Sequence, residues 1–219
     1  MVADDEQIPD YWNDWRLTPD EFNRVIHTNS NALSAIFGYV AEERVRDIHL
    51  ENSSKISNIR TPEDQDSADN GDWVFEYQGE PMRIECKSLQ TASIEKVESQ
   101  QKTLNGNENP TEWEATFHIK GSSDQRTIEY EGEDYDTTLL DLEETDIDIM
   151  AVNLYRIKDK WDFGFAKMGD LPRSAGNYPE GLREKLAKSQ PKIELPLREP
   201  FTDNLCELMD EVLEEREDT

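Results

Sequence analysis

The chain has 219 residues, with 50 Asp plus Glu against 23 Lys plus Arg and a formal net charge of −27. This length allows one sizeable core, and no apolar run reaches the roughly 18 residues that a membrane-spanning helix needs. Acids scattered along the whole chain at this density suit life in molar salt, where a Debye length of roughly 3 Å screens self-repulsion. We therefore expect a halophilic protein. The acidic, polar N-terminus and the two widely spaced cysteines predict a reduced, cytoplasmic protein with no membrane partner.

The first predicted elements are two helices. The segment Thr18–Glu21 matches a capping box with Pro at the first helical position, which predicts a helix over about 19–27. A second helix, capped by Ser30 or Asn31, is predicted over about 31–50 because its apolar residues form one stripe.

A polar stretch, 51–71, predicts a surface loop that leads into a β-hairpin. Trp73–Tyr77 and Met82–Lys87 have the alternating apolar pattern of strands, and residues 78–81 lie between them as a turn. Side chains alternate between the two faces of a strand. The apolar residues of the second strand, Met82, Ile84 and Cys86, are therefore predicted to face the core.

Three charged side chains are predicted to converge at the end of this hairpin. If the turn is symmetric about Gly79 and Glu80, Asp72 lies opposite Lys87, and Asp72, Glu85 and Lys87 share one face. Two carboxylates beside an ammonium could bind a metal ion and position a water, since Mg²⁺ prefers carboxylate oxygens. In such an acidic chain the alternative is a solvated hairpin face. Lys87, however, is the only lysine with an acid two positions before it.

Further along the chain the pattern predicts more strands and a last helix. Asp148 begins a buried strand, where it could contact the site or simply end a loop, and the second role is favoured. The predicted ranges are a strand and then a helix within 88–101, a turn at 105–110, strands at 113–120, 127–130, 147–155 and 160–167, an extended segment at 191–200 and a helix at 201–216.

The order Asp72, then Glu85-Cys86-Lys87, resembles the catalytic core of the PD-(D/E)XK nucleases, the restriction-endonuclease-like superfamily. The resemblance implies that Asp72, Glu85 and the backbone carbonyl of Cys86 bind Mg²⁺, with Mn²⁺ as a substitute. It also implies that Lys87 orients or activates the attacking water. This agrees with the chemistry of a metal ion that acidifies water and neutralises charge on a scissile phosphate.

The resemblance extends to other segments. Glu42 matches the acid of the family's first helix and would assist at the metal directly or through water, with Glu43 as the alternative. Arg126 and Arg173 are candidate phosphate contacts because guanidinium fits phosphate with two hydrogen bonds, although surface ion pairs would explain them equally well. The other matching segments are 137–139, 148–154, 161–163 and 170–173.

We therefore expect an α/β fold with a mixed central β-sheet flanked by helices, a restriction-endonuclease-like core. The prediction is one nuclease-like domain over 1–219, with a core at about 30–170, an N-terminal arm at 1–29 and a C-terminal extension at 171–219.

The predicted function is Mg²⁺-dependent hydrolysis of DNA by a restriction or defence-type endonuclease, which could act as a homodimer to cut both strands. The alternative is a catalytically silent nuclease-fold module that binds nucleic acid or protein. The net negative charge opposes DNA binding at ordinary ionic strength, but molar salt suppresses that repulsion.

Overall fold

The computed structural model describes residues 14, 16–62, 71–89, 91–97, 112–119 and 126–217. The chain separates into two compact units, Met1–Tyr39 and Val40–Thr219, and the boundary falls inside a helix. Within the described ranges, no helix combines the length and the apolar character needed to cross a bilayer.

The first unit contains the predicted capped helix, α2 (Pro19–Thr28). The hydroxyl of Thr18 accepts from the backbone N–H of Glu21 (3.2 Å), and the Glu21 carboxylate accepts from the backbone N–H of Thr18 (2.9 Å). Both bonds of the predicted capping box are therefore confirmed.

The next helix, α3 (Ser30–Val45), has a different cap from the predicted one. The side-chain oxygen of Asn29 accepts from the backbone N–H of Ala32 (3.1 Å), so Asn29 is the N-cap, and the prediction of Ser30 or Asn31 was wrong. Three consecutive polar residues can all cap a helix. Asn29 is chosen because it also ends α2, which leaves no separate linker between the two helices.

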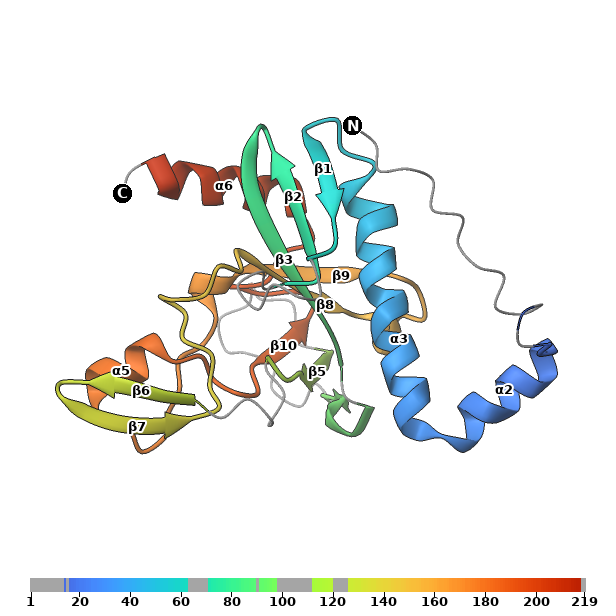
Figure 1. Ribbon diagram of the computed structural model, residues 1–219, viewed down its shortest axis with the longest axis horizontal. Helices are drawn as coiled ribbons and strands as arrows, with labels where there is room; N and C mark the ends of the chain where they lie inside the picture. The colour runs from blue at the N-terminus through green and yellow to red at the C-terminus, as the bar shows by residue number, and fades with distance from the viewer. Residues whose placement is uncertain are drawn as a thin grey trace, which may run out of the picture. The chain divides into compact units, whose positions relative to one another are not determined.

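The second unit is built on a mixed five-stranded sheet in the order β1-β2-β3-β8-β9 (Figure 1). The β3–β8 pair is parallel, and the other pairs are antiparallel. This confirms the predicted α/β class with a mixed central sheet. The strands are β1 (Ile56–Arg60), β2 (Trp73–Tyr77), β3 (Glu80–Ser88), β8 (Ile149–Asn153) and β9 (Phe163–Lys167).

Strand β1 lies in the stretch predicted to be a surface loop, so that prediction was wrong for residues 56–60. The strand pairs with β2 at the edge of the sheet, and only Ile56 and Ile59 are half-buried. An edge strand of mostly polar residues has no clear alternating pattern, because few of its side chains contact the core.

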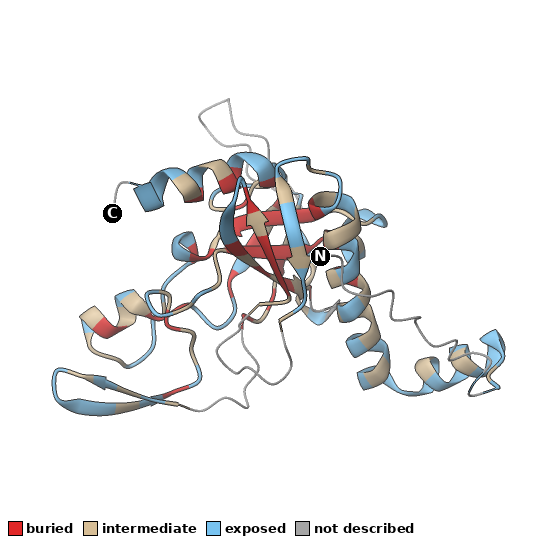
Figure 2. Ribbon diagram, turned by 45° about the horizontal axis from the view of Figure 1, so that its top comes forward, coloured by how far each residue is buried: buried red, intermediate tan, exposed pale blue. Residues whose placement is uncertain are grey.

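Helices cover one face of the five-stranded sheet. The C-terminal part of α3, the π-helix η1 (Arg46–Leu50) and α6 (Leu205–Glu217) contribute to one apolar cluster with the sheet. As predicted, Met82, Ile84 and Cys86 are buried in this cluster. Figure 2 shows how the buried residues concentrate in the strands of this sheet.

A second, smaller sheet covers the opposite face. It has the order β10-β5-β4, and its residues Ala115 and Ile193 pack with Met150 and Val152 of β8. Residues of the predicted C-terminal extension therefore belong to the core on both faces of the large sheet. The strands are β4 (Glu95–Lys96), β5 (Trp113–Thr116) and β10 (Lys192–Leu195).

The remaining elements are short. A two-stranded hairpin, β6–β7, stands apart from both sheets. The predicted turn at 105–110 and the end of the helix predicted within 88–101 lie outside the described residues. The elements are η2 (Thr91–Ser93), β6 (Arg126–Tyr130), β7 (Glu133–Thr137), α4 (Tyr155–Lys158), η3 (Met168–Asp170) and α5 (Glu180–Lys185).

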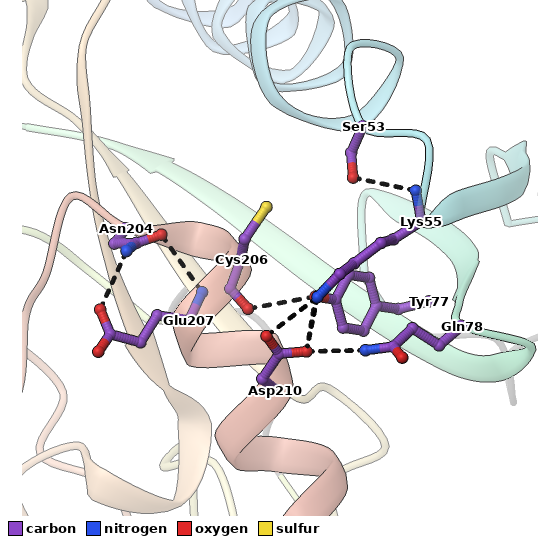
Figure 3. A network of polar contacts seen from close by, with 8 residues as sticks. All are labelled: Ser53, Lys55, Tyr77, Gln78, Asn204, Cys206, Glu207 and Asp210. Carbon is purple, nitrogen blue, oxygen red and sulfur yellow. Dashed lines mark hydrogen bonds and ion pairs between the residues drawn. The ribbon is translucent and has the colours of Figure 1, made fainter.

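A polar network fastens the β2–β3 hairpin to α6 (Figure 3). The hydroxyl of Tyr77 donates to the carboxylate of Asp210 (2.8 Å) and accepts from the ammonium of Lys55 (2.9 Å). Gln78 in the turn donates to the same carboxylate (2.7 Å). The hairpin that carries the candidate site is thus held at its turn by a helix far away in the sequence.

Candidate active site

The β2–β3 turn sets the register of the candidate site. Gln78 and Gly79 both have positive φ angles, 55° and 92°, which is the two-residue type I′ turn that matches strand twist. Trp73 pairs with Ile84, so the predicted four-residue turn centred on Gly79 and Glu80 was wrong. The true register differs from the predicted one by two positions.

The pairing of the two strands ends at Trp73 and Ile84, and the backbone N–H of Asp72 donates to the carbonyl of Ile84, so the predicted position of Asp72 opposite Lys87 was wrong. A shift of two residues keeps the same faces of the strands together, whereas a shift of one would exchange them. The predicted sharing of a face by Glu85 and Lys87 therefore does not depend on the turn.

Asp72 is fastened directly to β3. Its backbone N–H donates to the carbonyl of Ile84 (2.9 Å), and its carboxylate accepts from the backbone N–H of Cys86 (2.6 Å). The preceding Gly71 has φ +101°, and a Cβ there would lie 3.2 Å from the Ile84 carbonyl oxygen. Glycine is required at this position because other residues would be strained and would push Asp72 away from the strand.

Glu85 and Lys87 form an ion pair on β3. Their side chains are only 16% and 28% exposed, so the pair is largely shielded from solvent. Burial lowers the pKa of Lys87, but the negative charges of Glu85 and Asp72 outweigh it and raise that pKa above the usual value. The ammonium consequently stays charged at neutral pH.

Glu42 belongs to the same electrostatic cluster. Burial first, and then the charge of Asp72, raise the pKa of Glu42 to about 7, with Lys87 acting in the opposite direction. The carbonyl of Glu42 accepts from the indole N–H of Trp73 (2.9 Å), which fixes this turn of α3 beside β2. The alternative acid, Glu43, is exposed and forms an ion pair with Arg46 (2.8 Å).

The pKa of Asp72 is raised as well. Burial and the neighbouring charge of Glu85 raise the pKa of Asp72 to about 6, although Lys87 and the Cys86 N–H oppose the shift. The Cys86 thiol lies in the core, where burial raises its pKa well above the usual value, so only its backbone could contribute at neutral pH. Three carboxyl groups and one ammonium group therefore lie close together in a site that is partly shielded from solvent.

The donor set fits a hard divalent cation. Asp72 and Glu85 offer carboxylate oxygens, and Mg²⁺ typically binds one or two carboxylates while keeping several waters. Repulsion between close acids would also be relieved by a positive ion. Among the described residues, no three His, Cys, Asp or Glu side chains gather closely enough to enclose a metal ion by themselves. The metal-binding roles of Asp72, Glu85 and the Cys86 carbonyl stay predictions.

The two candidate phosphate contacts lie in different surroundings. Arg126 donates to the carbonyl of Leu139 (2.5 Å) and lines a cavity that Glu85 also lines. Arg173 donates to the carbonyls of Leu171 (2.9 Å) and Gly169 (2.8 Å) and does not line that cavity. Both guanidinium groups thus stabilise nearby backbone, and their role at phosphate stays a prediction.

Asp148 has the structural role that the sequence favoured. Its carboxylate accepts from the backbone N–H of Arg83 (2.8 Å) and from the guanidinium of Arg216 (2.5 Å). These bonds join the start of β8 to β3 and to α6. Asp148, which directly precedes β8, therefore helps to position β3.

Two features of the site escaped the sequence analysis. One is Gly71, whose position after an asparagine and before Asp72 could have indicated a positive φ. The other is the cavity beside Glu85, whose wall includes the buried Asp141. No local pattern could have linked Asp141 to Glu85, because the two residues come to line one cavity only in the tertiary structure.

Comparison of the chain with protein-family models, with curated proteins and with solved structures finds no match.

Proposed function

We propose that this protein hydrolyses DNA phosphodiester bonds as a divalent-metal-dependent endonuclease of the restriction or defence type. The observation that carries the proposal is the arrangement around one short stretch of β3. Glu85 and Lys87 form an ion pair there, and Asp72 is bonded to the backbone of the residue between them. Structural roles alone do not require two shielded acids to lie close enough for their charges to repel, since this repulsion opposes folding.

In this proposal Asp72 and Glu85 hold Mg²⁺ with the help of the Cys86 carbonyl. The ion, when bound, would lower the pKa of a coordinated water and neutralise charge on the scissile phosphate. Asp72 uses one oxygen in its bond to Cys86, so its other oxygen would be the one available to a metal ion. Glu42, close enough to affect the same charges, assists directly or through a water.

Lys87 acts as a fixed positive charge. In the metal-free protein, Glu85 and Asp72 raise its pKa, so it retains its proton at neutral pH. Its ammonium orients the attacking water and stabilises the negative charge that develops on phosphate.

One observation favours a second candidate, a nuclease-fold module that binds nucleic acid or protein without cutting. Both site acids already have partners within the chain: Asp72 accepts from Cys86, and Glu85 pairs with Lys87. In that case these contacts stabilise the hairpin. Removing them would lower the stability of the protein and would not change any catalytic activity.

A plasmid-nicking assay in molar KCl with Mg²⁺ tests the proposal. Wild type should nick the plasmid, and Asp72→Ala and Lys87→Ala should each lower the rate by at least about a hundredfold, in the range of lost electrostatic stabilisation. The matched controls Asp134→Ala and Lys188→Ala remove the same charges from exposed positions and should retain the rate.

Equal nicking by wild type and both site variants would refute the site. Binding of DNA without cleavage, measured by gel shift in the same salt, would favour the second candidate. A single-stranded RNA of the same sequence, included as a parallel substrate, decides whether the preference is for DNA.

A further inference from the structure

A cavity of about 200 Å³ adjoins the candidate active site. Its wall includes Glu85 and also Gly71, the neighbour of Asp72. An engineered apolar cavity of about 150 Å³ is large enough for benzene, so this one can accept a flat system of one or two rings. Its other polar lining residues are Arg126, Asp141, Glu144 and Thr145, and Leu140, Met150 and Met168 are among the apolar ones.

Asp141 gives this cavity an acceptor with spare capacity. The residue is only 3% exposed, and one of its oxygens accepts from the backbone N–H of Glu143 (2.9 Å). Within the described part of the chain, Lys185 pairs with Glu143 (2.6 Å), and no cation lies within ion-pair distance of Asp141. Lys185 still interacts with Asp141 through its charge, and the second carboxylate oxygen of Asp141 has no hydrogen bond to the described residues.

Arg126 gives the same cavity spare donors. A guanidinium carries five N–H donors, and the described residues accept only the one that points to Leu139 (2.5 Å). Its Nε is buried and has no hydrogen-bond partner among the described residues. Because that Nε is closed off from solvent, the spare donors for a ligand are the remaining N–H groups of the two terminal guanidinium nitrogens. The cavity thus combines unused donors with unused acceptors.

The charge of the wall decides which ligand fits. Glu85, Asp141 and Glu144 face one arginine, so a free phosphate group would be repelled. A neutral ring that presents adjacent donors to a carboxylate and an acceptor to the guanidinium is favoured. Guanine has adjacent N–H donors that match the two oxygens of a carboxylate, and its O6 accepts from a guanidinium.

We infer that this cavity binds a guanine base, and that the base belongs to the nucleotide beside the phosphodiester that the site hydrolyses. The second clause rests on the proposed function, whereas the first does not. A base can enter only from a single strand or after leaving the duplex stack, as in enzymes that flip bases out of the helix. The enzyme would therefore select guanine beside the cut.

The test is a calorimetric titration of the full chain in molar KCl and EDTA with each of the four 2′-deoxynucleosides. Deoxyguanosine should bind at least about tenfold more tightly than the others, which corresponds to about 1.4 kcal/mol. Asp141→Asn, which removes the acceptor charge, should lower its affinity about tenfold or more. Thr145→Phe, which fills the cavity from a half-buried position, should abolish binding.

Glu143→Gln is the matched control, because it removes a neighbouring exposed carboxylate that does not line the cavity. It should leave the affinity within about twofold. Equal affinity for the four nucleosides, no binding by folded wild type, or unchanged binding by both Asp141→Asn and Thr145→Phe would overturn the inference. If Asp141→Asn does not fold, Thr145→Phe alone decides.

The titration contains no divalent metal and measures no cleavage, so the two proposals fail separately. Nicking without selective guanine binding would leave the hydrolase intact and refute the cavity. Guanine binding without nicking would keep the cavity and refute the hydrolase.

Discussion

Replacing Asp72 by asparagine should stabilise the metal-free protein at alkaline pH. The folded pKa of this carboxyl is about 6, against an ordinary value of 3.8, so the folded state holds the proton more tightly than the unfolded chain. The stabilising effect of protonation is fully present below about pH 3.8 and is lost as pH rises through about 6. Above that pH the ionised carboxylate opposes folding.

The size of the effect follows from this shift. A difference of about two pKa units corresponds to roughly 3 kcal/mol at 1.36 kcal/mol per unit. Salt screens the part that comes from neighbouring charges, and asparagine is a weaker acceptor for the Cys86 N–H, which costs about 1 kcal/mol. The variant Asp72→Asn should therefore exceed wild type by about 1–2 kcal/mol in free energy of unfolding at pH 8.

The measurement is urea unfolding followed by tryptophan fluorescence, in molar KCl with EDTA, at about pH 4.5 and about pH 8. The advantage of Asp72→Asn should disappear at the lower pH. The matched control Asp134→Asn removes a charge from the exposed β6–β7 hairpin and should change stability by less than about 0.5 kcal/mol. If the Asp72 variant is less stable than wild type at pH 8, or if its advantage does not change with pH, the account of this carboxyl is wrong.

Three further predictions concern how the site is held. Tyr77→Phe removes the hydroxyl that joins Asp210 and Lys55, and it should lower the free energy of urea unfolding by about 1 kcal/mol. The control Tyr135→Phe on the exposed hairpin should lower it by less than about half as much, and equal losses would contradict a stabilising role of the Tyr77 network. Gly71→Ala should cost at least about 1 kcal/mol because of its positive φ, and Gly38→Ala, in a helix with open space around it, should instead raise the melting temperature; a neutral Gly71→Ala would show that the backbone there relaxes freely. Asp148→Asn should lower the free energy of unfolding by about 2 kcal/mol, because Arg216 and the Arg83 N–H lose a charged acceptor. A thermal unfolding curve that this substitution leaves unchanged would refute the stabilising role of Asp148.

Local patterns in the sequence were sufficient where neighbours along the chain decide the structure. The capping box at Thr18 predicted α2 because its hydrogen bonds join residues three positions apart. Strand alternation placed Met82, Ile84 and Cys86 in the core, which fixed the opposite face for Glu85 and Lys87. The apolar run within 147–155 likewise predicted a buried strand, and every residue of β8 is buried.

The errors arose where local signals were ambiguous. The turn at 78–81 could be closed by two or by four residues, and the positive φ of Gln78 and Gly79 selects the shorter one. Three polar residues in a row could each cap α3, and the end of α2 selects Asn29. Strand β1 left little pattern because it lies at an edge.

The sequence by itself determined which side chains of β3 share a face, because alternation along an extended chain follows from backbone geometry alone. Only the tertiary structure decided that Glu42, and not the exposed Glu43, shares the charge environment of Asp72. It also decided that Asp141 and Arg126 line a cavity with Glu85. These residues are far apart in the sequence and come together only when long chain segments fold around the sheet. Burial of the apolar core drives that folding, so the sequence around each site residue does not indicate its neighbours.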